Sequence, residues 1–561
     1  MEKTTKLIHG GYTMCRLIFP IIIAISIITG CGVVPVKEAE SVITEEFLFG
    51  HTRYLSHDLL EGRGPGTRGD DLARYYIASQ LEAMGIMPGG PDGSYFQKIP
   101  LVGMTADPDI HLTVTRGNQR RTFKFHEDFV PFSSVLEPTV PVNGELVFVG
   151  FGIRAPEFDW DDYKGQDMSG KILVMLNVDH GTEKTPDDFG GEVRTYYGRW
   201  TYKYEIAAEL GAAGAILIHT TPSAGYPFSV LQNYFSREYF ELRVNDVQRL
   251  PLKAWTSEKA SREILEMAGY SLEDLKERAQ SRDFEPVPLK MQAKTAIRQT
   301  IRKIDTYNVL GLLRGGDPNY SDQVVVYTAH YDHFGIGGPV DGDSIYNGAL
   351  DNAIGVSMIM SIAGAFQKMP VPPGRSILFA AVGAEEFGML GSEYYVRNPT
   401  FPPNRIVACI NIDGANIWGP TRDIVFLGAE RSAIGNVVKS IAHRRKLVAA
   451  GDPTPEQGVF YGSDHFSFVK AGIPSVSLGL GREFFGKTEN WGEEQYFRYL
   501  AKNHHQPSDE ITDDWDLRGA VDQARFCFEV GWKLSTAREI PHWNVGDEFE
   551  AVRKASYLIT R

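Results

Sequence analysis

The chain has 561 residues, a length that predicts more than one compact unit. Hydrophobic residues make up 43% of it and charged residues 23%, which is ordinary for a folded protein and excludes a disordered, collagen-like or coiled-coil chain. The net charge of −14 argues against nucleic acid as a partner, because a phosphate-binding surface needs a basic stripe.

Residues 1–31 resemble a bacterial lipoprotein signal. Lys3, Lys6 and Arg16 precede the short apolar run LIFPIIIAISII, and a Thr-Gly pair stands directly before Cys31. The run is too short for an ordinary membrane helix. We expect export to the bacterial cell envelope and a lipid anchor on Cys31, on the periplasmic side or at the cell surface. A plain cleaved signal with an incidental cysteine is the alternative.

Only two cysteines remain after the signal. Cys409 and Cys527 both lie in apolar stretches, so we expect buried free thiols. Two isolated cysteines provide neither a disulfide framework nor a cysteine zinc site. Any metal in the mature chain must therefore be bound by nitrogen and oxygen.

The first half of the mature chain divides into two segments. Residues 32–135 contain a glycine-rich loop followed by the amphipathic stretch DLARYYIASQLEAMGI, which predicts a helix. Residues 136–290 contain short apolar runs such as KILVMLNV and AILIHTT, which predict a β-rich insert. The insert resembles the protease-associated (PA) domain through GQDMSGKILVML and KYEIAAELGAAGAILIH, and the resemblance implies substrate gating or docking.

The segment 291–561 alternates apolar strands with helices. QVVVYTAH, SILFAAVG and RIVACINID are apolar on both faces, and helical patterns such as GVSMIMSIAGAFQKM separate them. Strands of this kind indicate an α/β fold with a mostly parallel, mixed sheet flanked by helices.

Charged side chains follow three of these strands. His330 ends the first strand, Glu385 and Glu386 follow the second, and Asp413 follows the third. Because the carboxyl ends of parallel strands meet at one edge of a sheet, we expect these groups to lie close together. Burying a carboxylate costs several kcal/mol unless it is compensated, so the group indicates a bound cation. Nitrogen and oxygen donors suit Zn²⁺, with Mn²⁺ or Co²⁺ as substitutes.

The segments TAHYDHFG, NGALDNAIG, GAEEFGMLGS, NIDG, GSDHFSFVKAGIP and HHQPSDE follow one another along residues 291–561. Through them the chain resembles the paired-zinc peptidases that include aminopeptidase Y, glutamate carboxypeptidase and the transferrin receptor. The early segment LEGRGPGTRGDDLARYYIASQLEAMGI is similar to the N-terminal part of the same family, so residues 32–135 are expected to be the N-terminal part of the peptidase domain and residues 291–561 its catalytic part. The resemblance implies the phosphorylase/hydrolase-like fold and two Zn²⁺ ions per chain. The ligands that it implies are His330, Asp351, Glu386, Asp413 and His505.

The resemblance also implies roles. Asp351 bridges both ions, His330 and Asp413 complete one site, and Glu386 and His505 complete the other. Glu385 is the general base, which activates a water between the two metals.

Three further residues are expected to support this group. His465 stabilises the oxyanion, Asp332 hydrogen-bonds His330, and Asp509 hydrogen-bonds His505. His504 departs from relatives, which often have Tyr there, so the choice between His504 and His505 rests on the spacing of the HHQPSDE segment.

These residues predict hydrolysis of peptides by an exopeptidase, with an aminopeptidase preferred over a carboxypeptidase. The residues around the metals leave that choice open, because end selection depends on loops that recognise an amine or a carboxylate. Two different functions compete with this prediction: acyl transfer of the glutaminyl-cyclase type, with one zinc, and receptor-like binding without catalysis. The sequence does not predict an oligomeric state.

Two aromatic stretches have open roles. Trp491, Tyr496, Phe497 and Tyr499 precede the histidine pair and are expected either to line a substrate pocket or to pack a surface loop. The run RTYYGRWTYKYE near residue 200 is expected either to wall the cleft or to pack the insert.

Overall fold

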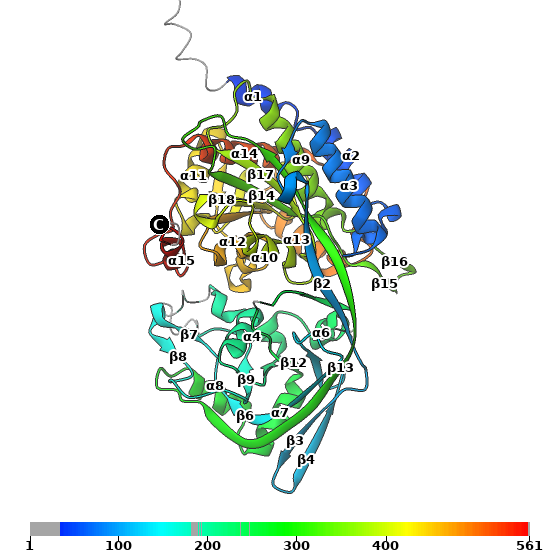
Figure 1. Cartoon of the computed structure of the whole chain (residues 1–561), viewed down its shortest axis with the longest axis vertical. Coiled ribbons are helices and arrows are strands. Elements are labelled where there is room, and N and C mark those ends of the chain that lie inside the picture. The colour runs from blue at the N-terminus through cyan, green and yellow to red at the C-terminus, as the bar shows by residue number, and fades with distance from the viewer. Residues whose placement is uncertain are drawn as a thin grey trace, which may run out of the picture.

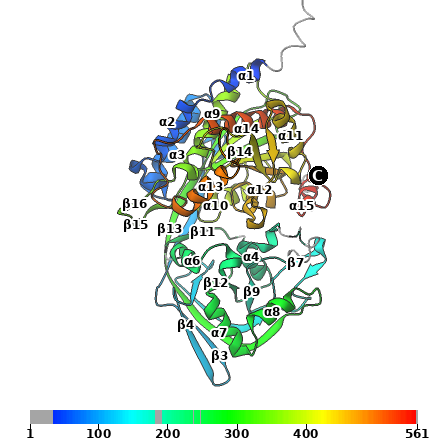
Figure 2. The same cartoon turned by 180° about the vertical axis from the view of Figure 1, so that it is seen from behind.

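The computed structural model describes residues 34–180, 189, 191, 193–235, 237–245 and 247–558. The predicted signal, with Cys31, lies outside this part of the chain. The described residues form two lobes, one above the other in Figure 1, and Figure 2 shows the same arrangement from behind.

The upper lobe is built on a mixed sheet with a parallel centre. In spatial order its strands are β11 (Tyr239–Leu242), β2 (Phe96–Ala106), β13 (Val287–Leu313), β17 (Ser376–Val382), β14 (Val324–His330), β18 (Ile406–Ile412), β21 (Ser475–Gly479), β19 (Asp423–Leu427) and β20 (Val448–Ala450). Strands β17, β14, β18 and β21 run parallel, while antiparallel pairs extend both edges.

Helices cover both faces of this sheet, which explains why its central strands are apolar throughout. One face packs against α2 (Glu45–Leu55), α3 (Arg68–Ala83), α9 (Ile354–Lys368), α11 (Ile434–Arg445) and α14 (Arg518–Thr536). The other face packs against α10 (Leu390–Arg397) and α12 (His465–Lys470). Every residue of β14, β17 and β18 is buried. The predicted α/β fold with a helix-flanked sheet is confirmed.

Helix α9 lies at the centre of the upper lobe. Ala349–Lys368 is long and apolar enough to cross a membrane, with a mean hydropathy of 1.4, but 89% of that stretch is buried inside the protein. Burial of this kind is typical of a core helix. The free thiols of Cys409 and Cys527 are buried in the same lobe, as predicted.

The lower lobe is formed by residues 107–298, apart from β11. Its sheet has the spatial order β5 (Phe129–Phe132), β12 (Leu252–Thr256), β10 (Gly214–Ile218), β9 (Ile172–Leu176), β6 (Thr139–Phe148), β13, β3 (His111–Arg116) and β4 (Gln119–Lys124). Helices α4 (Trp200–Glu209), α6 (Phe228–Phe235), α7 (Glu258–Ala268) and α8 (Leu272–Ala279) accompany it.

Strand β13 belongs to both sheets and joins the lobes. Its first half pairs with β6 and β3 in the lower sheet, and its second half pairs with β2 and β17 in the upper sheet. The lower lobe therefore begins before the predicted insert 136–290, because β3, β4 and β5 precede residue 136. Because β13 is one continuous strand that belongs to both lobes, the sequence pattern does not change where the lower lobe ends.

Candidate metal centre

The predicted ligands meet where the parallel strands of the upper lobe end. His330 is the last residue of β14, Glu386 follows β17, and Asp413 follows β18. Asp351 lies in the turn of helix before α9, and His505 lies in the loop after α13 (Trp491–Lys502). Segments from across the second half of the chain thus bring five nitrogen and oxygen donors to one edge of the sheet.

Asp351 lies between two pairs of donors. Its Oδ1 is 3.1 Å from His330 Nε2, which is also 3.3 Å from Asp413 Oδ1. Its Oδ2 is 3.3 Å from His505 Nε2, which is also 3.1 Å from Glu386 Oε2. One carboxylate therefore faces a His-Asp pair on one side and a Glu-His pair on the other.

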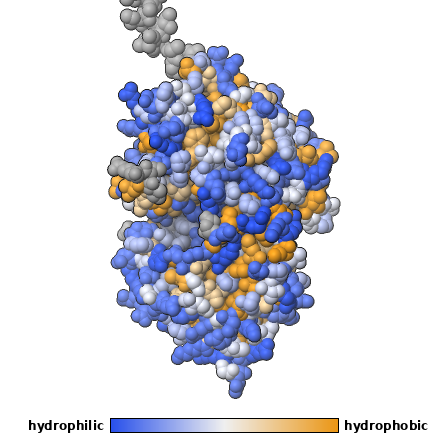
Figure 3. Space-filling model, viewed as in Figure 1, coloured by the Kyte–Doolittle hydropathy of each residue, from blue (hydrophilic) through white to orange (hydrophobic). Residues whose placement is uncertain are grey.

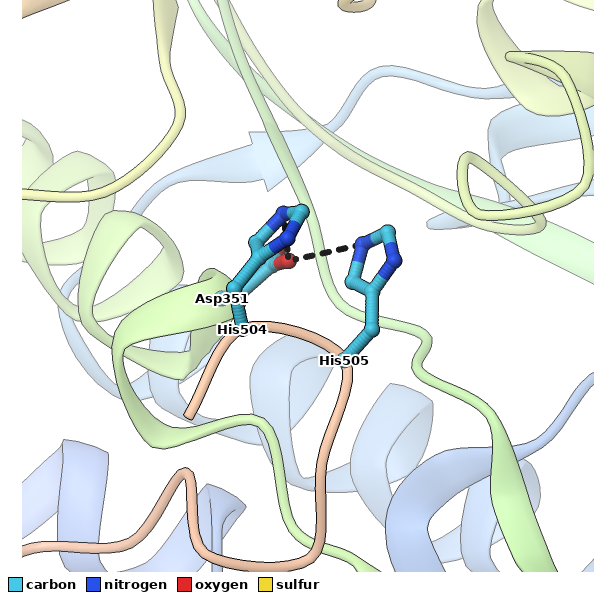
Figure 4. A group of neighbouring side chains, drawn as sticks. All are labelled: Asp351, His504 and His505. Atoms are coloured by element: carbon cyan, nitrogen blue, oxygen red, sulfur yellow. Dashed lines mark ion pairs between the residues drawn. The ribbon is translucent and has the colours of Figure 1, made fainter. Parts of the chain in front are cut away.

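His504 accompanies His505 at this centre. The two imidazole rings stack with centroids 3.7 Å apart, and His504 Nε2 lies 3.5 Å from Asp351 Oδ2 (Figure 4). Asp351, His504 and His505 form one group of potential metal ligands, and His330, Asp351 and Glu386 form another. The structure therefore brings both histidines of the HHQPSDE segment to Asp351, and only His505 also contacts Glu386.

Buried backbone donors hold two of the carboxylates in place. Asp509 accepts hydrogen bonds from the amides of Leu350 (3.1 Å) and Asp351 (3.0 Å) and from the Tyr499 hydroxyl (3.2 Å). Asp509 therefore positions Asp351, whereas the sequence predicted a contact with His505. The two carboxylate oxygens of Asp509 accept from the backbone of the turn that carries Asp351.

Asp332 differs from its prediction in the same way. Its Oδ1 lies 3.8 Å from His330 Nδ1, too far for a hydrogen bond, and that nitrogen instead lies 3.3 Å from the Asp332 carbonyl oxygen. The carboxylate accepts from the backbone amides of Glu385 (3.0 Å) and Glu386 (3.4 Å). Asp332 thus fixes the turn that carries both glutamates.

His465 is buried and does not line the cavity. Its side chain has no exposed surface, packs against the Phe460 ring at 5.0 Å, and is not part of the cavity wall described below. Burial lowers the pKa of His465 to about 4, so the ring is neutral at pH 7. Its oxyanion role remains a prediction.

The sequence did not predict three residues that support the centre, namely Arg63, His333 and Ser463. Arg63 is fully buried and donates hydrogen bonds to the carbonyls of Leu55, Tyr331, Asn347 and Gly348, with distances of 2.6 to 3.0 Å.

The other two are His333, which is hydrogen-bonded to Glu386, and Ser463, which donates to Asp413 at 2.7 Å. His333 stands close after His330 in the TAHYDHFG segment and could have been recognised from it. Arg63 lies in a glycine-rich loop that carries no signal of this role.

Burial and charge shift the pKa values of the acids in opposite directions. Burial, with Asp464 and Asp413 nearby, raises the pKa of Glu385 well above its usual range, which makes this side chain a strong proton acceptor. Burial would also raise the pKa of Glu386, but Asp351 adds to that effect and His505 and His333 outweigh both, so that it falls to about 2. Glu386 is therefore ionised and suited to bind a cation, while Glu385 is suited to take a proton.

The donor set fits a pair of divalent ions. Carboxylate and imidazole groups, without thiolate, match zinc sites of the catalytic kind. The close approach of Asp351, Glu386 and Asp413 costs free energy unless a positive charge lies among them. Asp351 lies between two sets of donors, so the residues present fit one cation on each side of it.

A cavity of about 500 Å³ opens beside these residues, between the two lobes. Asp351, Glu385, Glu386, Asp413 and His505 line one side of it, and His504 is also part of its wall. Hydrophobic surface also gathers along the seam between the lobes on the face seen in Figure 3. The cavity therefore has the size and mixed lining of a small-ligand site.

Both aromatic stretches contribute to this cavity. Tyr496 and Tyr499 of α13 line it from the upper lobe, and Trp200 lines it from the lower lobe. For these residues the expectation of a pocket lining is confirmed. Trp491 and Phe497 are not in the cavity wall; Trp491 packs on Phe484 at 5.1 Å.

Comparison with known proteins finds a family match within the upper lobe. Residues 308–526 match the model of peptidase family M28, and this segment contains all five predicted ligands. This part of the chain is therefore similar to peptidase family M28.

Individual relatives agree with the family match. The chain is 25% identical over 249 residues to leupeptin-inactivating enzyme 1 of Streptomyces exfoliatus, covering 44% of this chain and 51% of the relative. It is 31% identical over 252 residues to a probable leucine aminopeptidase 2 of Aspergillus oryzae, covering 43% and 47%. The chain thus spans about half the length of these curated relatives.

A solved aminopeptidase from Aneurinibacillus sp. strain AM-1 shares the fold. The match covers 90% of this chain and 97% of that one, with 16% identity and a TM-score of 0.50. The likeness extends over both lobes and not only over the segment that matches the family.

The contacts of Asp509 generate a first prediction. In Asp509→Asn one oxygen that accepts from a backbone amide becomes an amide group, so the turn carrying Asp351 loses a hydrogen bond. We expect the affinity for Zn²⁺ to fall about 10- to 100-fold, measured by competition with a chromogenic chelator. Asp513→Asn, an exposed aspartate in the same segment, is the matched control and should bind normally. Equal affinities in the two variants would contradict the positioning role of Asp509.

Proposed function

We propose that the protein is a zinc-dependent exopeptidase, specifically an aminopeptidase, that binds two Zn²⁺ ions per chain. The observation that carries the proposal is the position of Asp351, with His330 and Asp413 on one side and Glu386 and His505 on the other. The family match over residues 308–526 supports the same function.

The reaction follows from the residues around this centre. His330, Asp351, Glu386, Asp413 and His505 would hold zinc ions, which would polarise the scissile carbonyl and the attacking water as Lewis acids. Glu385 removes a proton from that water and returns it to the leaving amine. Asp332 holds the backbone of Glu385 and Glu386, so that one glutamate stays with the cation and the other stays with the water.

We further propose that His504 donates to the oxygen of the carbonyl as it gains negative charge. His504 lines the cavity next to Asp351, whereas His465 is fully buried and is absent from the cavity wall. A hydrogen-bond donor placed where charge develops stabilises the transition state. The proposal thus moves the oxyanion role from the residue that the sequence predicted to the one that faces the substrate space.

Relatives favour aminopeptidase over carboxypeptidase activity. Proteins named aminopeptidase occur among the matches from Aspergillus oryzae, Mus musculus and Bacillus subtilis, and a probable glutamate carboxypeptidase from Arabidopsis thaliana also matches. The metal centre is compatible with either activity. Carboxypeptidase activity is therefore the second candidate.

We also propose export and lipid anchoring at Cys31, with the lower lobe acting as a protease-associated (PA) domain. The support for the anchor is the basic, apolar and Thr-Gly-Cys order of residues 1–31. The support for the PA assignment is the GQDMSGKILVML segment, together with a β-rich lobe that forms one wall of the cavity.

The proposed function is tested by metal content and a substrate panel. We expect about two zinc ions per chain by elemental analysis of the purified, signal-free protein, with hydrolysis of aminoacyl-anilides but not of N-blocked peptides. Cleavage restricted to N-blocked peptides with a free carboxylate would make the protein a carboxypeptidase. One zinc per chain without peptide hydrolysis would favour acyl transfer of the glutaminyl-cyclase type. Absence of both bound metal and turnover would favour a receptor-like protein and would contradict the proposal.

Glu385→Gln separates catalysis from metal binding. The amide keeps the size of the side chain but cannot accept the proton, so we expect kcat to fall about 10²- to 10⁴-fold with an unchanged zinc content. Steady-state kinetics and elemental analysis on the same preparation measure both quantities. A zinc-loaded variant with wild-type activity would refute the role of Glu385 as base.

His504→Ala and His465→Ala distinguish the two candidate donors. We expect His504→Ala to lower kcat about 10²- to 10³-fold, with partial recovery in His504→Gln, because glutamine restores an N–H donor. His465→Ala should chiefly lower the melting temperature, because it opens a cavity beside Phe460. The reverse pattern in kcat would return the oxyanion role to His465.

A further inference from the structure

Two arginines line the cavity without an acidic partner. Arg199 directly precedes α4 in the lower lobe, and Arg482 follows β21 in the upper lobe. Nε of Arg199, and Nε and Nη1 of Arg482, are shielded from solvent and form no hydrogen bond. Within the described part of the chain, neither guanidinium has a carboxylate within ion-pair distance.

Unpaired donors on half-buried cations of this kind are costly. A shielded charged donor loses its hydration without recovering the free energy through a partner. Most arginines in folded proteins avoid this state, so the pair indicates a ligand that completes it. The planar guanidinium matches a carboxylate through two parallel N–H bonds, which makes a carboxylate the best-fitting ligand.

The contacts of Arg482 leave two of its donor nitrogens, Nε and Nη1, without a partner. Its guanidinium lies over the ring of Tyr496, 3.6 Å from the centroid. Stacking uses the face of the guanidinium, whereas N–H groups point outward in its plane. Asp452 also lines the cavity, but within the described part of the chain it forms no ion pair with Arg482. The stacked Arg482 is thus fixed in position and still able to bind.

Both arginines lie close to the metal centre. A Cβ on Gly462 would meet Arg199 Nη2 at 3.7 Å, and the next residue, Ser463, donates to the ligand Asp413. Tyr496, under Arg482, is one helical turn from Tyr499, whose hydroxyl reaches Asp509. Both arginines line the same cavity as the metal ligands, and a peptide of two or three extended residues, at about 3.3–3.6 Å each, would lie along it.

We propose that Arg482 and Arg199 bind the free C-terminal carboxylate of a short peptide substrate. This inference rests on the proposed peptidase function and names its substrate class: peptides of two or three residues with an unblocked C-terminus. The side chains of such a peptide would lie against Trp200, Tyr226, Tyr234 and Trp255, which the lower lobe contributes to the cavity. The lower lobe thus takes part in choosing the substrate.

The experiment measures binding apart from hydrolysis. In zinc-loaded Glu385→Gln protein, the dissociation constants of leucyl-phenylalanine and of its C-terminal amide are compared through the fluorescence of Trp200 and Trp255. We expect the acid to bind about 10- to 100-fold more tightly, as charge-assisted hydrogen bonds would provide. Adding Arg482→Gln should bring the ratio close to one, and Arg482→Lys should keep part of it.

Two controls sharpen this comparison. Arg302→Gln removes an exposed arginine of β13 that pairs with Glu238, and it should leave the ratio unchanged. Leucyl-glutamate amide offers a side-chain carboxylate without a free C-terminus. If it binds as tightly as the acid, the site recognises an acidic side chain and the proposed C-terminal recognition is wrong.

Failure of this proposal can be told apart from failure of the proposed function. Equal binding of acid and amide would overturn carboxylate recognition, even if aminoacyl-anilides are hydrolysed by the wild-type protein. An unchanged ratio in both Arg482→Gln and Arg199→Gln would overturn the assignment to these residues. Absence of anilide hydrolysis by the zinc-loaded wild type would instead count against the peptidase function, while the binding data would still decide the carboxylate site.

Discussion

The mutual repulsion of buried carboxylates is the constraint on which the upper lobe depends. Asp351, Glu385, Glu386 and Asp413 meet at one edge of the sheet, and Asp332 and Asp509 stand directly behind them. Such a group is stable only when cations and N–H donors surround it. Imidazoles face the carboxylates in front, and backbone amides bind the two supporting aspartates behind.

The side chains that face the cavity and the two aspartates behind them, Asp332 and Asp509, have different roles. The ligands in front keep an open side toward the cavity, where a substrate and a metal would meet. The aspartates behind accept hydrogen bonds from the very turns that carry the ligands. Asp351 and Glu386 are therefore positioned by hydrogen bonds to the backbone from which each side chain projects.

Arg63 explains why the N-terminal segment belongs to this lobe. Its guanidinium reaches the carbonyls before the Asp351 turn and after β14, and thus joins the two loops that carry His330 and Asp351. Burying this cation would be costly alone, but the surrounding acids offset the cost: burial lowers the pKa of Arg63 to about 10, and Asp332 and Asp509 act against that effect. The early glycine-rich loop is therefore a structural part of the metal centre.

The parts of the site that could be predicted are those fixed by strand periodicity. His330, Glu386 and Asp413 end apolar strands, and parallel strands must bring their carboxyl ends together. The partners of Asp332 and Asp509 could not be predicted, because a carboxylate binds whichever N–H donor the turn presents, and sequence spacing does not specify turn geometry. His504 and His465 illustrate the same limit: both are histidines near the ligands, and only packing decides which one faces the cavity.

The boundary of the lower lobe escaped prediction for a different reason. Strand β13 pairs in both sheets without a turn, so no change of pattern marks the point where one lobe ends. This continuity has a consequence for function, since β13 and β2 hold the lower lobe at a fixed edge of the upper sheet. The aromatic residues around Trp200 are thereby held opposite the metal ligands. Under the proposed function, the upper sheet would supply the chemistry and both lobes the shape of the substrate space. The lower lobe could then vary in sequence, and with it the substrate preference, without disturbing the carboxylates proposed to bind the metal.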